Sequence, residues 1–372
     1  MQKIYPNESD VLFDASRIVL RNLKGRHPTG VDNVLKGFIQ GFKGDYFFLI
    51  RYKIFVFIIS PYSSKIVFNF IQNDKRIPLP SLIFFVLKDI FTPTFYIFKK
   101  FDIYFNLGHS GVNNRTFLKI IKLIAKENIF LIHDLIPIRF PKFCIEGEKD
   151  RHENRMRNIL DFSSKIIFNS DITAKHFFYW LNERNFSYDE KKTKVIKPAS
   201  SLIFNINQKR KHFSMVGTIE PRKGYEEIVE LFRCRNRPPF KLVIVGQPGW
   251  KSDELIMNLE SLNQEGKLVW LKNCNNKKLI EIMSSSIALI QNSMAEGFGL
   301  SIIEALDNQL QVFIRHSEEI ELFCNENVVY FRDIDELLEI IKSGNYCQRE
   351  IAYKASRTWK DATNELLTFS KS

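Results

Sequence analysis

The feature that most constrains this sequence is an alternation of short apolar runs with helical runs, which occurs twice along the chain. In the first half, Val11–Asp14 and Asp102–Asn106 have the composition of buried strands, and helices are expected from about Asp32 and over Thr116–Glu127. A second series begins at His212. Strands that alternate with helices of about 10–15 residues predict parallel sheets covered on both faces.

The domain boundaries are expected where this periodicity is lost. The stretch Lys191–Lys211 is polar and has no clear period, which is typical of a linker. The sequence therefore predicts an α/β fold of two Rossmann-like domains, residues 1–197 and 210–350, with parallel sheets that face a central cleft. A last helical segment, residues 351–372, has no strand after it. Open sheets of this kind bind ligands outside the carboxyl ends of their strands.

The positive charge of the chain is confined to its first half. Residues 1–200 carry 32 Lys and Arg against 19 Asp and Glu, whereas residues 201–372 carry 22 against 23. Such asymmetry predicts an anionic partner for the first half, either a membrane surface, a lipid-linked phosphate or nucleic acid; a well-solvated basic surface is the alternative. No recognition motif for nucleic acid is present, and the 34 Phe residues mostly lie in runs typical of a core.

Neither of the two most apolar stretches is expected to span a membrane. Tyr46–Ser60 and Leu82–Phe98 are interrupted by charged residues, whereas a spanning helix needs about 20 nearly uncharged ones. The first is interpreted as two strands, Tyr46–Tyr52 and Ile54–Ser60, and the second as an amphipathic helix. Contact of one of them with one face of a membrane is the alternative. Five scattered cysteines and the absence of a signal peptide at the start of the sequence favour a cytoplasmic location.

The most informative run joins a strand end near Gln291 to a helix that begins near Ser301. Glu296, Gly297, Phe298 and Gly299 lie in the loop between them, and Glu304 follows in the first turn of the helix. Glycines allow a ligand to approach the backbone, and a helix start offers free N–H groups to an anion. The spacing Ser301-x-x-Glu304 also fits a capping box, in which Glu304 would only satisfy backbone donors.

A second loop carries two adjacent cations after a strand. Gly217 ends the strand, and Arg222 and Lys223 precede a helix. Arg as a fork and Lys as a point charge suit a diphosphate, although an exposed basic pair is the more common outcome of such a sequence.

Together these two segments resemble the donor domain of family 4 retaining glycosyltransferases, which have the two-domain GT-B architecture. Glu296 and Glu304 match the Glu-x7-Glu motif of that family, and Glu220–Gly224 matches its phosphate-binding loop. Val245–Trp250 resembles a further segment between them. The likeness covers residues 212–340, and the three segments occur in the family's order.

The first half resembles the same family at fewer positions. His133 and Asp134, in the run Ile132–Pro137, resemble the strand end whose His approaches the donor sugar. Gly30 resembles the glycine-rich first loop, although this chain has one glycine where the family often has two. Residues 355–359 resemble the start of the helix that crosses back to the first domain.

The resemblance implies a role for each of these residues. The catalytic residues would be Glu296, His133, Arg222 and Lys223; the donor-binding residues would be Glu304, Gly297, Phe298, Gly299, Gly30 and Gly217; and His109 and Asp134 would lie on the acceptor side. No metal and no cofactor are expected, because Arg222 and Lys223 would stabilise the departing diphosphate. The one Asp-x-Asp sequence, Asp333–Asp335, is interpreted as a helix cap.

We therefore expect a retaining hexosyltransferase that acts on a nucleoside-diphosphate sugar, with GDP-mannose as the first donor to consider. The likeness is greatest to bacterial mannosyltransferases of surface-polysaccharide assembly, which implies a lipid-linked glycan acceptor at the inner face of the cytoplasmic membrane. Three alternatives stay open: a sugar-nucleotide epimerase on a similar scaffold, hydrolysis by a carboxylate pair, and a basic nucleic-acid-binding protein.

Overall fold

The computed structural model describes residues 10–90, 99–206, 209–233, 238–320, 322–323, 325–344 and 357–372. The chain forms two compact units. Unit 1 comprises Met1–Leu135, Asp150–Pro198 and Thr358–Ser372, and unit 2 comprises Ile136–Lys149 and Ala199–Arg357. Each unit is a predominantly parallel α/β sheet with helices packed on it, as the alternation of strands and helices predicts.

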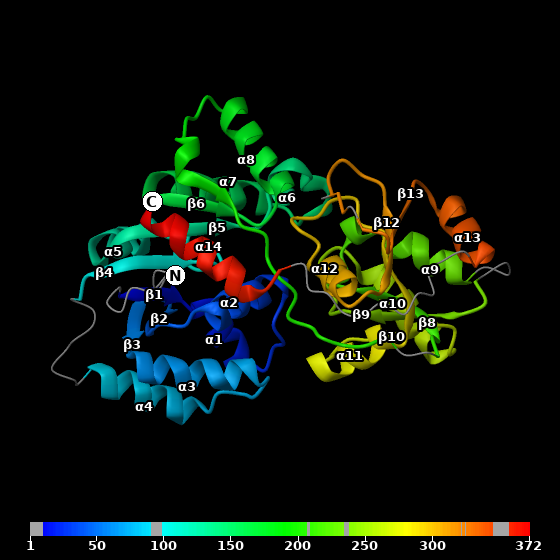
Figure 1. Ribbon diagram of the computed structural model, residues 1–372, viewed down its shortest axis with the longest axis horizontal. Coiled ribbons are helices and arrows are strands. Elements are labelled where there is room, and N and C mark those ends of the chain that lie inside the picture. The colour runs from blue at the N-terminus through cyan, green and yellow to red at the C-terminus, as the bar shows by residue number, and fades with distance from the viewer. Residues whose placement is uncertain are drawn as a thin grey trace. The chain divides into compact units, whose positions relative to one another are not determined.

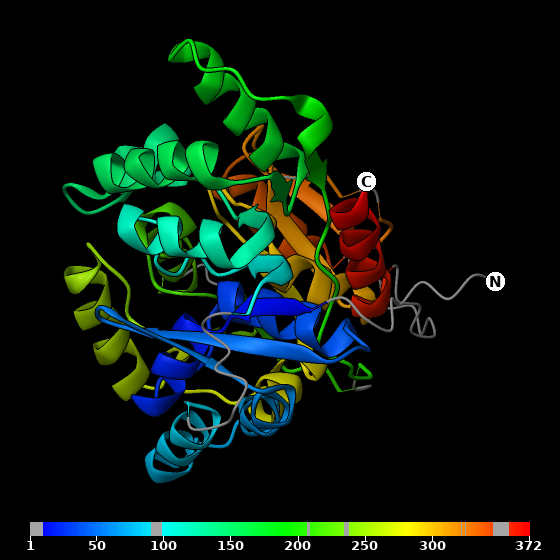
Figure 2. The ribbon, with the colours of Figure 1, turned by 90° about the vertical axis from the view of Figure 1, so that its left-hand side faces the viewer.

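Unit 1 has a seven-stranded sheet in the order β3-β2-β1-β4-β5-β6-β7 (Figure 1). Its strands are β1 (Val11–Asp14), β2 (Tyr46–Tyr52), β3 (Phe55–Ile59), β4 (Phe101–Asn106), β5 (Ala125–Ile132), β6 (Lys165–Phe168) and β7 (Thr193–Val195). Its helices are α1 (Ser16–Leu23), α2 (Gly30–Gly41), α3 (Pro61–Gln72), α4 (Leu79–Ile90), α5 (Arg115–Ile124), α7 (Glu148–Phe162), α8 (Asp171–Glu183) and α14 (Trp359–Lys371). Figures 1 and 2 show α3 and α4 at the β3 end of unit 1, and α7 and α8 at its opposite end.

Three details of unit 1 differ from the sequence-based expectation. β3 runs antiparallel to β2 through a two-residue turn, in which Lys53 has a φ of 54°. The helix expected to reach Glu127 ends at Ile124, because Ala125 is extended and pairs with Phe101 of β4. Thr193–Val195 pairs with β6, so the stretch expected to be a linker contains a strand. As a half-buried edge strand, β7 needs no apolar period.

Unit 2 has a six-stranded sheet in the order β10-β9-β8-β11-β12-β13, and all of its pairs are parallel. Its strands are β8 (His212–Val216), β9 (Lys241–Val245), β10 (Val269–Leu271), β11 (Ser286–Gln291), β12 (Gln311–Arg315) and β13 (Val328–Phe331). Its helices are α6 (Ile136–Arg139), α9 (Tyr225–Arg233), α10 (Asp253–Gln264), α11 (Asn276–Ser284), α12 (Leu300–Asp307) and α13 (Ile334–Ser343).

Residues 136–149 belong to unit 2, whereas the sequence-based boundaries placed them in the first domain. The Trp250 indole N–H donates to the Phe143 carbonyl at 2.7 Å, and Lys251 donates to the Lys142 carbonyl at 3.4 Å. These bonds to a loop of unit 2 explain the assignment, which no local pattern in the sequence could show.

The last helix, α14, belongs to unit 1 and packs against α2. The Trp359 indole fills the space beside Gly37, and Thr363 donates to the Phe38 carbonyl at 3.0 Å. Of the terminal segment expected to be helical, residues 351–356 lie outside the described residues, and the helix begins at Trp359. Lys165 donates to the carbonyls of Phe369 and Ser370, where a cation complements the carboxyl end of a helix.

Candidate functional site

Both motif-bearing loops of unit 2 leave the sheet at one place. The loop that carries Arg222 and Lys223 follows β8, and the loop that carries Glu296 follows β11. These strands are neighbours in the sheet, although they are far apart in the sequence. The strand order reverses between them, and the carboxyl ends at such a switch point are where open α/β sheets bind ligands.

Glu296 is the centre of a buried ion cluster. It is 7% exposed, pairs with Lys223, and lies with its second carboxylate oxygen 3.1 Å from an Arg222 Nη1. Arg222 also donates to the Ala295 carbonyl at 2.8 Å and through Nε to Glu220 at 3.0 Å. Arg222 and Lys223 are therefore not an exposed surface pair, because the fold buries them against a carboxylate from the other loop.

Neutral donors complete the shell around Glu296. Ser293 Oγ and Gln291 Nε2 each donate to the carboxylate at 2.6 Å. Burial by itself raises the pKa of Glu296, but the cations of Lys223 and Arg222 outweigh it and hold the pKa at about 2. Glu296 is therefore ionised at neutral pH, with two cations at its side.

Glycine is favoured at two positions of these loops for conformational and steric reasons. Gly299 has a φ of 81° and stands at the N-cap of α12, where an L side chain is strained and a Cβ would lie 2.8 Å from Ile302. Gly217 has a φ of 148° and accepts a hydrogen bond from the Tyr225 hydroxyl at 2.8 Å. Gly297 and Phe298 lie with Glu296 in the loop after β11, and Phe298 is buried.

Glu304 does not act as a helix cap. The N-cap residue of α12 is Gly299, and no side chain caps this helix, so the capping-box interpretation of Ser301 and Glu304 is wrong. The Glu304 side chain is 6% exposed, and among the described residues it has no hydrogen bond or ion pair. Burial, together with the nearby Asp307, raises the pKa of Glu304 to about 8. A buried carboxyl without a partner is unusual unless a ligand completes it.

We expect Glu304→Gln to change how stability depends on pH. The native state keeps the Glu304 proton up to a pKa of about 8, while the unfolded chain loses it near 4.5. The stabilisation is thus complete below pH 4.5, and between the two values it falls by about 1.4 kcal/mol per pH unit. Glu304→Gln should remove this slope. The free energy of urea unfolding, measured for both proteins from about pH 5 to about pH 8, tests it; equal slopes would contradict the expectation.

The candidate histidines of unit 1 lie side by side. His133 follows β5, is buried, and donates from Nε2 to the Leu107 carbonyl at 2.7 Å. The ring of His109 stands edge-on to His133, with 5.1 Å between centroids. His109 has a φ of 56°, which is rare outside glycine, and its buried Nε2 has no hydrogen bond within the described part of the chain. Burial lowers the pKa of both rings.

The other two predicted site residues of unit 1 are Asp134 and Gly30. The carbonyl of Asp134 receives a hydrogen bond from His152 Nε2 at 3.1 Å. Gly30 is the first residue of α2, and a Cβ there would meet no atom within 4 Å. The fold itself therefore does not require glycine at position 30. Thr29, which precedes Gly30, forms a capping box with Asp32 at the start of α2.

Several polar residues near these sites were not singled out by the sequence. In unit 2 they are Gln291, Ser293 and Glu220, which surround Glu296 and Arg222. In unit 1, Tyr104 donates to the buried Asp14 at 2.8 Å, at the switch point between β1 and β4. Polar residues at the ends of otherwise apolar strands are the one signal that could have pointed to them.

The Asp-x-Asp sequence acts as the expected helix cap. Asp333 is the N-cap of α13 and accepts a hydrogen bond from the Glu336 N–H at 2.9 Å. Across the described ranges, no three His, Cys, Asp or Glu side chains are grouped so that they could hold a metal ion.

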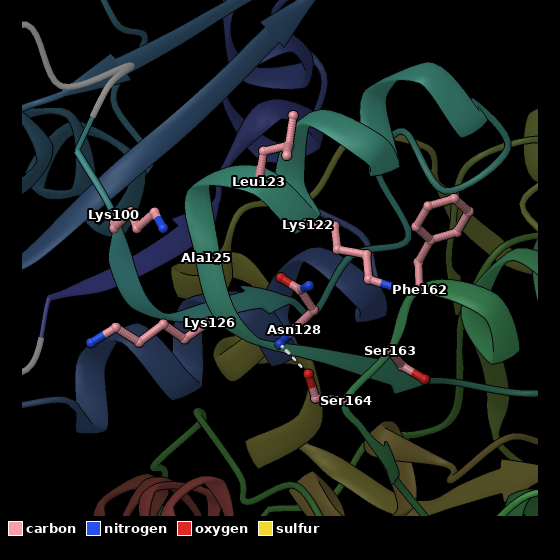
Figure 3. A pocket seen from close by; sticks show the side chains of 9 residues that line it. All are labelled: Lys100, Lys122, Leu123, Ala125, Lys126, Asn128, Phe162, Ser163 and Ser164. Atoms are coloured by element: carbon pink, nitrogen blue, oxygen red, sulfur yellow. Dashed lines mark hydrogen bonds between the residues drawn. The ribbon is translucent and has the colours of Figure 1, made fainter.

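A basic cavity lies at the other edge of the sheet of unit 1 (Figure 3). Its volume is about 370 Å³, and it opens where β4 and β5 begin. The Asn128 backbone N–H donates a hydrogen bond there to Ser164 Oγ at 3.0 Å. The lining residues are Lys100, Lys122, Leu123, Ala125, Lys126, Asn128, Phe162, Ser163 and Ser164. None of the predicted site residues lines this cavity.

Comparison with known protein families gives a match over most of unit 2, the unit that carries both motifs. Residues 197–343 match the family described as glycosyl transferases group 1. The serotype-specific mannosyltransferase WbdA of Escherichia coli is 29% identical over an alignment of 224 residues, which covers 54% of this chain and 27% of that protein. O-antigen chain mannosyltransferase B of the same organism is 31% identical over 94 residues, 24% of this chain and 25% of that protein. The chain thus spans about a quarter of the length of each relative.

Solved structures show the fold over nearly the whole chain. The Anabaena protein Alr3699/HepE in complex with UDP and glucose superposes with a TM-score of 0.59 at 16% identity, covering 98% of this chain and 95% of that one. Sucrose-phosphate synthase of Thermosynechococcus elongatus gives 0.56 at 14% identity, with 97% and 94% covered. The two-domain GT-B fold expected from the sequence is confirmed.

Proposed function

We propose that this chain, whose residues 197–343 form a group 1 glycosyltransferase domain, transfers a hexose from a nucleoside-diphosphate sugar to a glycan acceptor with retention of configuration. The observation that carries the proposal is the buried cluster of Glu296, Arg222 and Lys223 at the switch point of unit 2. It places two cations and an ionised carboxylate where a sheet of this kind holds its ligand.

The roles of these residues follow from the charges that the reaction creates. As the sugar leaves, negative charge develops on the diphosphate, and Arg222 and Lys223 stabilise it without the help of a metal. Glu296, held ionised by the same cations, accepts hydrogen bonds from the sugar hydroxyls. Glu304 accepts the ribose hydroxyls, and His133 contacts the sugar, the role that its match to the family's strand-end His implies. No cofactor is needed for these steps.

We propose mannose as the sugar and GDP-mannose as the donor, because the relatives with the most identity are named as mannosyltransferases. The acceptor is then a lipid-linked glycan of surface-polysaccharide assembly. The charge balance of +13 over residues 1–200 supports work at an anionic membrane surface on the cytoplasmic side.

A thermal-shift panel of GDP, UDP, ADP and TDP sugars tests the donor. A ligand that binds only the native state raises the melting temperature by mass action, so GDP-mannose should give the largest shift. Product analysis with and without an acceptor then separates transfer from epimerisation, since an epimerase converts the donor alone. No shift with any of the four would contradict the proposal.

The double variant Arg222→Ala with Lys223→Ala should weaken binding of GDP by about 100-fold or more, because two charge-assisted contacts to the diphosphate are lost. Guanosine, which has no phosphate, should bind the variant and the unmodified protein alike. Titration calorimetry with both ligands measures the difference. An equal loss for both ligands would mean that the substitutions only disturbed the fold, and an unchanged affinity for GDP would place the diphosphate elsewhere.

Binding of the nucleotide should also release a proton from Glu304. Its carboxyl has a pKa of about 8 without a ligand, and hydrogen bonds from ribose hydroxyls favour the ionised form. We expect up to one proton to be released per nucleotide at about pH 7. Calorimetry in buffers of different ionisation enthalpy counts that proton, and the Glu304→Gln variant should release none. Equal release by both proteins would contradict the role of Glu304.

A further inference from the structure

The helix α4 of unit 1 is apolar on two opposite sides. Its inner side carries Leu82 and Phe85, which are 6% and 9% exposed, and it packs against β3. The residues of its outer side are equally apolar and remain exposed: Leu79 by 56%, Ile83 by 49%, Phe84 by 61% and Leu87 by 48%. A surface helix of a globular protein normally turns polar residues outward, so this outer side needs an explanation.

The exposed residues form a continuous stripe. Leu79, Ile83 and Leu87 are spaced by four residues and therefore lie above one another on the helix, with Phe84 beside them. Tyr62 of α3, which is 65% exposed, adjoins the stripe, because the Lys88 ammonium lies 5.1 Å from the centre of its ring. We call these five residues with Lys88 the α4 patch. Figure 1 shows α4 at the outer margin of unit 1.

The charges around the α4 patch favour an anionic partner. Residues 51–90 contain six Lys and Arg and two Asp. Both acids are engaged: Asp89 is buried and accepts the Ser60 N–H at 2.8 Å, and Asp74 pairs with Lys36 at 3.5 Å. Lys65 of α3 pairs with Asp45, which lies just before this segment. Basic side chains still outnumber acidic ones along this part of unit 1.

Size and composition favour a bilayer over a second copy of the chain. Five large side chains that are about half exposed offer on the order of 500 Å², whereas each partner in a stable interface buries about 800 Å². An apolar stripe bordered by Lys and Tyr has the composition of helices that lie in a membrane interface, with the apolar side among the acyl chains and the cations at the headgroups. None of the described helices has the length and apolar character needed to cross a bilayer.

We propose that the α4 patch inserts into the interface of a membrane that carries anionic lipids. The proposal deepens the proposed function and rests on it for the lipid-linked acceptor, which a bound membrane would supply to unit 1. Two independent forces act together here: burial of Leu79, Ile83, Phe84 and Leu87 among lipid chains, and attraction of Lys88 and its basic neighbours to anionic headgroups.

Flotation with lipid vesicles tests the proposal. The unmodified protein should float with vesicles of phosphatidylcholine and phosphatidylglycerol much more than with phosphatidylcholine alone. The variant Ile83→Ser with Phe84→Ser should lower its partition to the anionic vesicles by about tenfold or more. The matched control is Met257→Ser, since Met257 is 65% exposed on α10 of unit 2. This control should bind as the unmodified protein does.

A spectroscopic variant reports on insertion directly. In Phe84→Trp, the indole should shift its emission to the blue when anionic vesicles are added, and brominated acyl chains should quench it. Lys88→Glu should weaken binding, and added salt should abolish most of that difference.

Four results would overturn the proposal: no binding of the unmodified protein to anionic vesicles, equal binding to both kinds of vesicle, binding that the serine variant retains, or a dimer in solution that the serine variant breaks. Thermal shifts with GDP-mannose keep the two proposals apart. Vesicle binding without any nucleotide shift would reject the proposed function alone, and a normal shift without vesicle binding would reject the α4 patch alone.

Discussion

Glu296→Gln should lower kcat/KM for sugar transfer by about 100- to 1,000-fold, the usual loss when one preorganised charged group leaves a site of this kind. The amide keeps the shape of the carboxylate but cannot accept the sugar hydroxyls with the same strength. It also leaves Lys223 without its counter-charge. Steady-state kinetics with the donor and an acceptor measure the loss.

The same substitution should destabilise the fold, which the sequence alone gave no reason to expect. Lys223 and Arg222 are both mostly buried, and removing one member of a buried ion pair costs about 3–5 kcal/mol. Adding Lys223→Gln to Glu296→Gln should restore part of the free energy of unfolding and none of the activity. If activity returned together with stability, Glu296 would be a structural residue only.

Glu230→Gln serves as the control for a lost carboxylate. Glu230 is on α9 in the same unit, and its side chain is 59% exposed in a pair with Arg233. Exposed pairs of this kind contribute at most about 1 kcal/mol, so neither activity nor unfolding should change measurably.

Gly37→Ala should destabilise unit 1 by about 1–3 kcal/mol or more through overpacking. A Cβ at position 37 would lie 2.0 Å from a ring carbon of Trp359, in the contact between α2 and α14. The indole would have to leave its place on Phe38, where the ring centroids are 5.3 Å apart. Urea unfolding of the two proteins measures the change.

Gly30→Ala is the matched control for stability on the same helix. A Cβ at Gly30 meets no atom within 4 Å, so alanine there should leave stability unchanged or raise it by about 0.4–1 kcal/mol. Adding Trp359→Leu to Gly37→Ala should recover part of the loss by making room for the methyl group. Equal effects of alanine at positions 30 and 37 would show that α14 does not depend on the close contact between Trp359 and Gly37.

The prediction from the sequence was most accurate for strands that are bounded by charged or glycine residues. Val11–Asp14 and Tyr46–Tyr52 have the bounds of β1 and β2, because their apolar runs are short and clearly interrupted. The amphipathic helix predicted over Leu82–Phe98 is confirmed in its first part by α4, which begins three residues earlier at Leu79, and residues 91–98 lie outside the described residues. The sequence did not predict β7, whose residues gain order only by pairing with β6.

The candidate site, too, has features that the sequence predicted and features that only the structure showed. Residue types and spacing were sufficient to nominate Glu296, Glu304, Arg222 and Lys223 as candidates, because carboxylates and a pair of cations after strand ends suit sugar hydroxyls and a diphosphate; their roles stay predictions. The sequence left two alternatives open, a capping role for Glu304 and a surface role for the Arg-Lys pair. The structure decided against both, through the N-cap at Gly299 and the burial of the pair against Glu296.

The sequence by itself determined the alternation of strands and helices and the chemistry carried by its two loops, because both depend on residues within a few positions of one another. Only the tertiary structure decided that Glu296 meets Arg222 and Lys223, which lie more than seventy positions away. The pairing of β8 with β11 brings them together, and no local pattern specifies which strands become neighbours. Burial then converts three separate charges into one cluster, because removal from water makes each charge depend on the others.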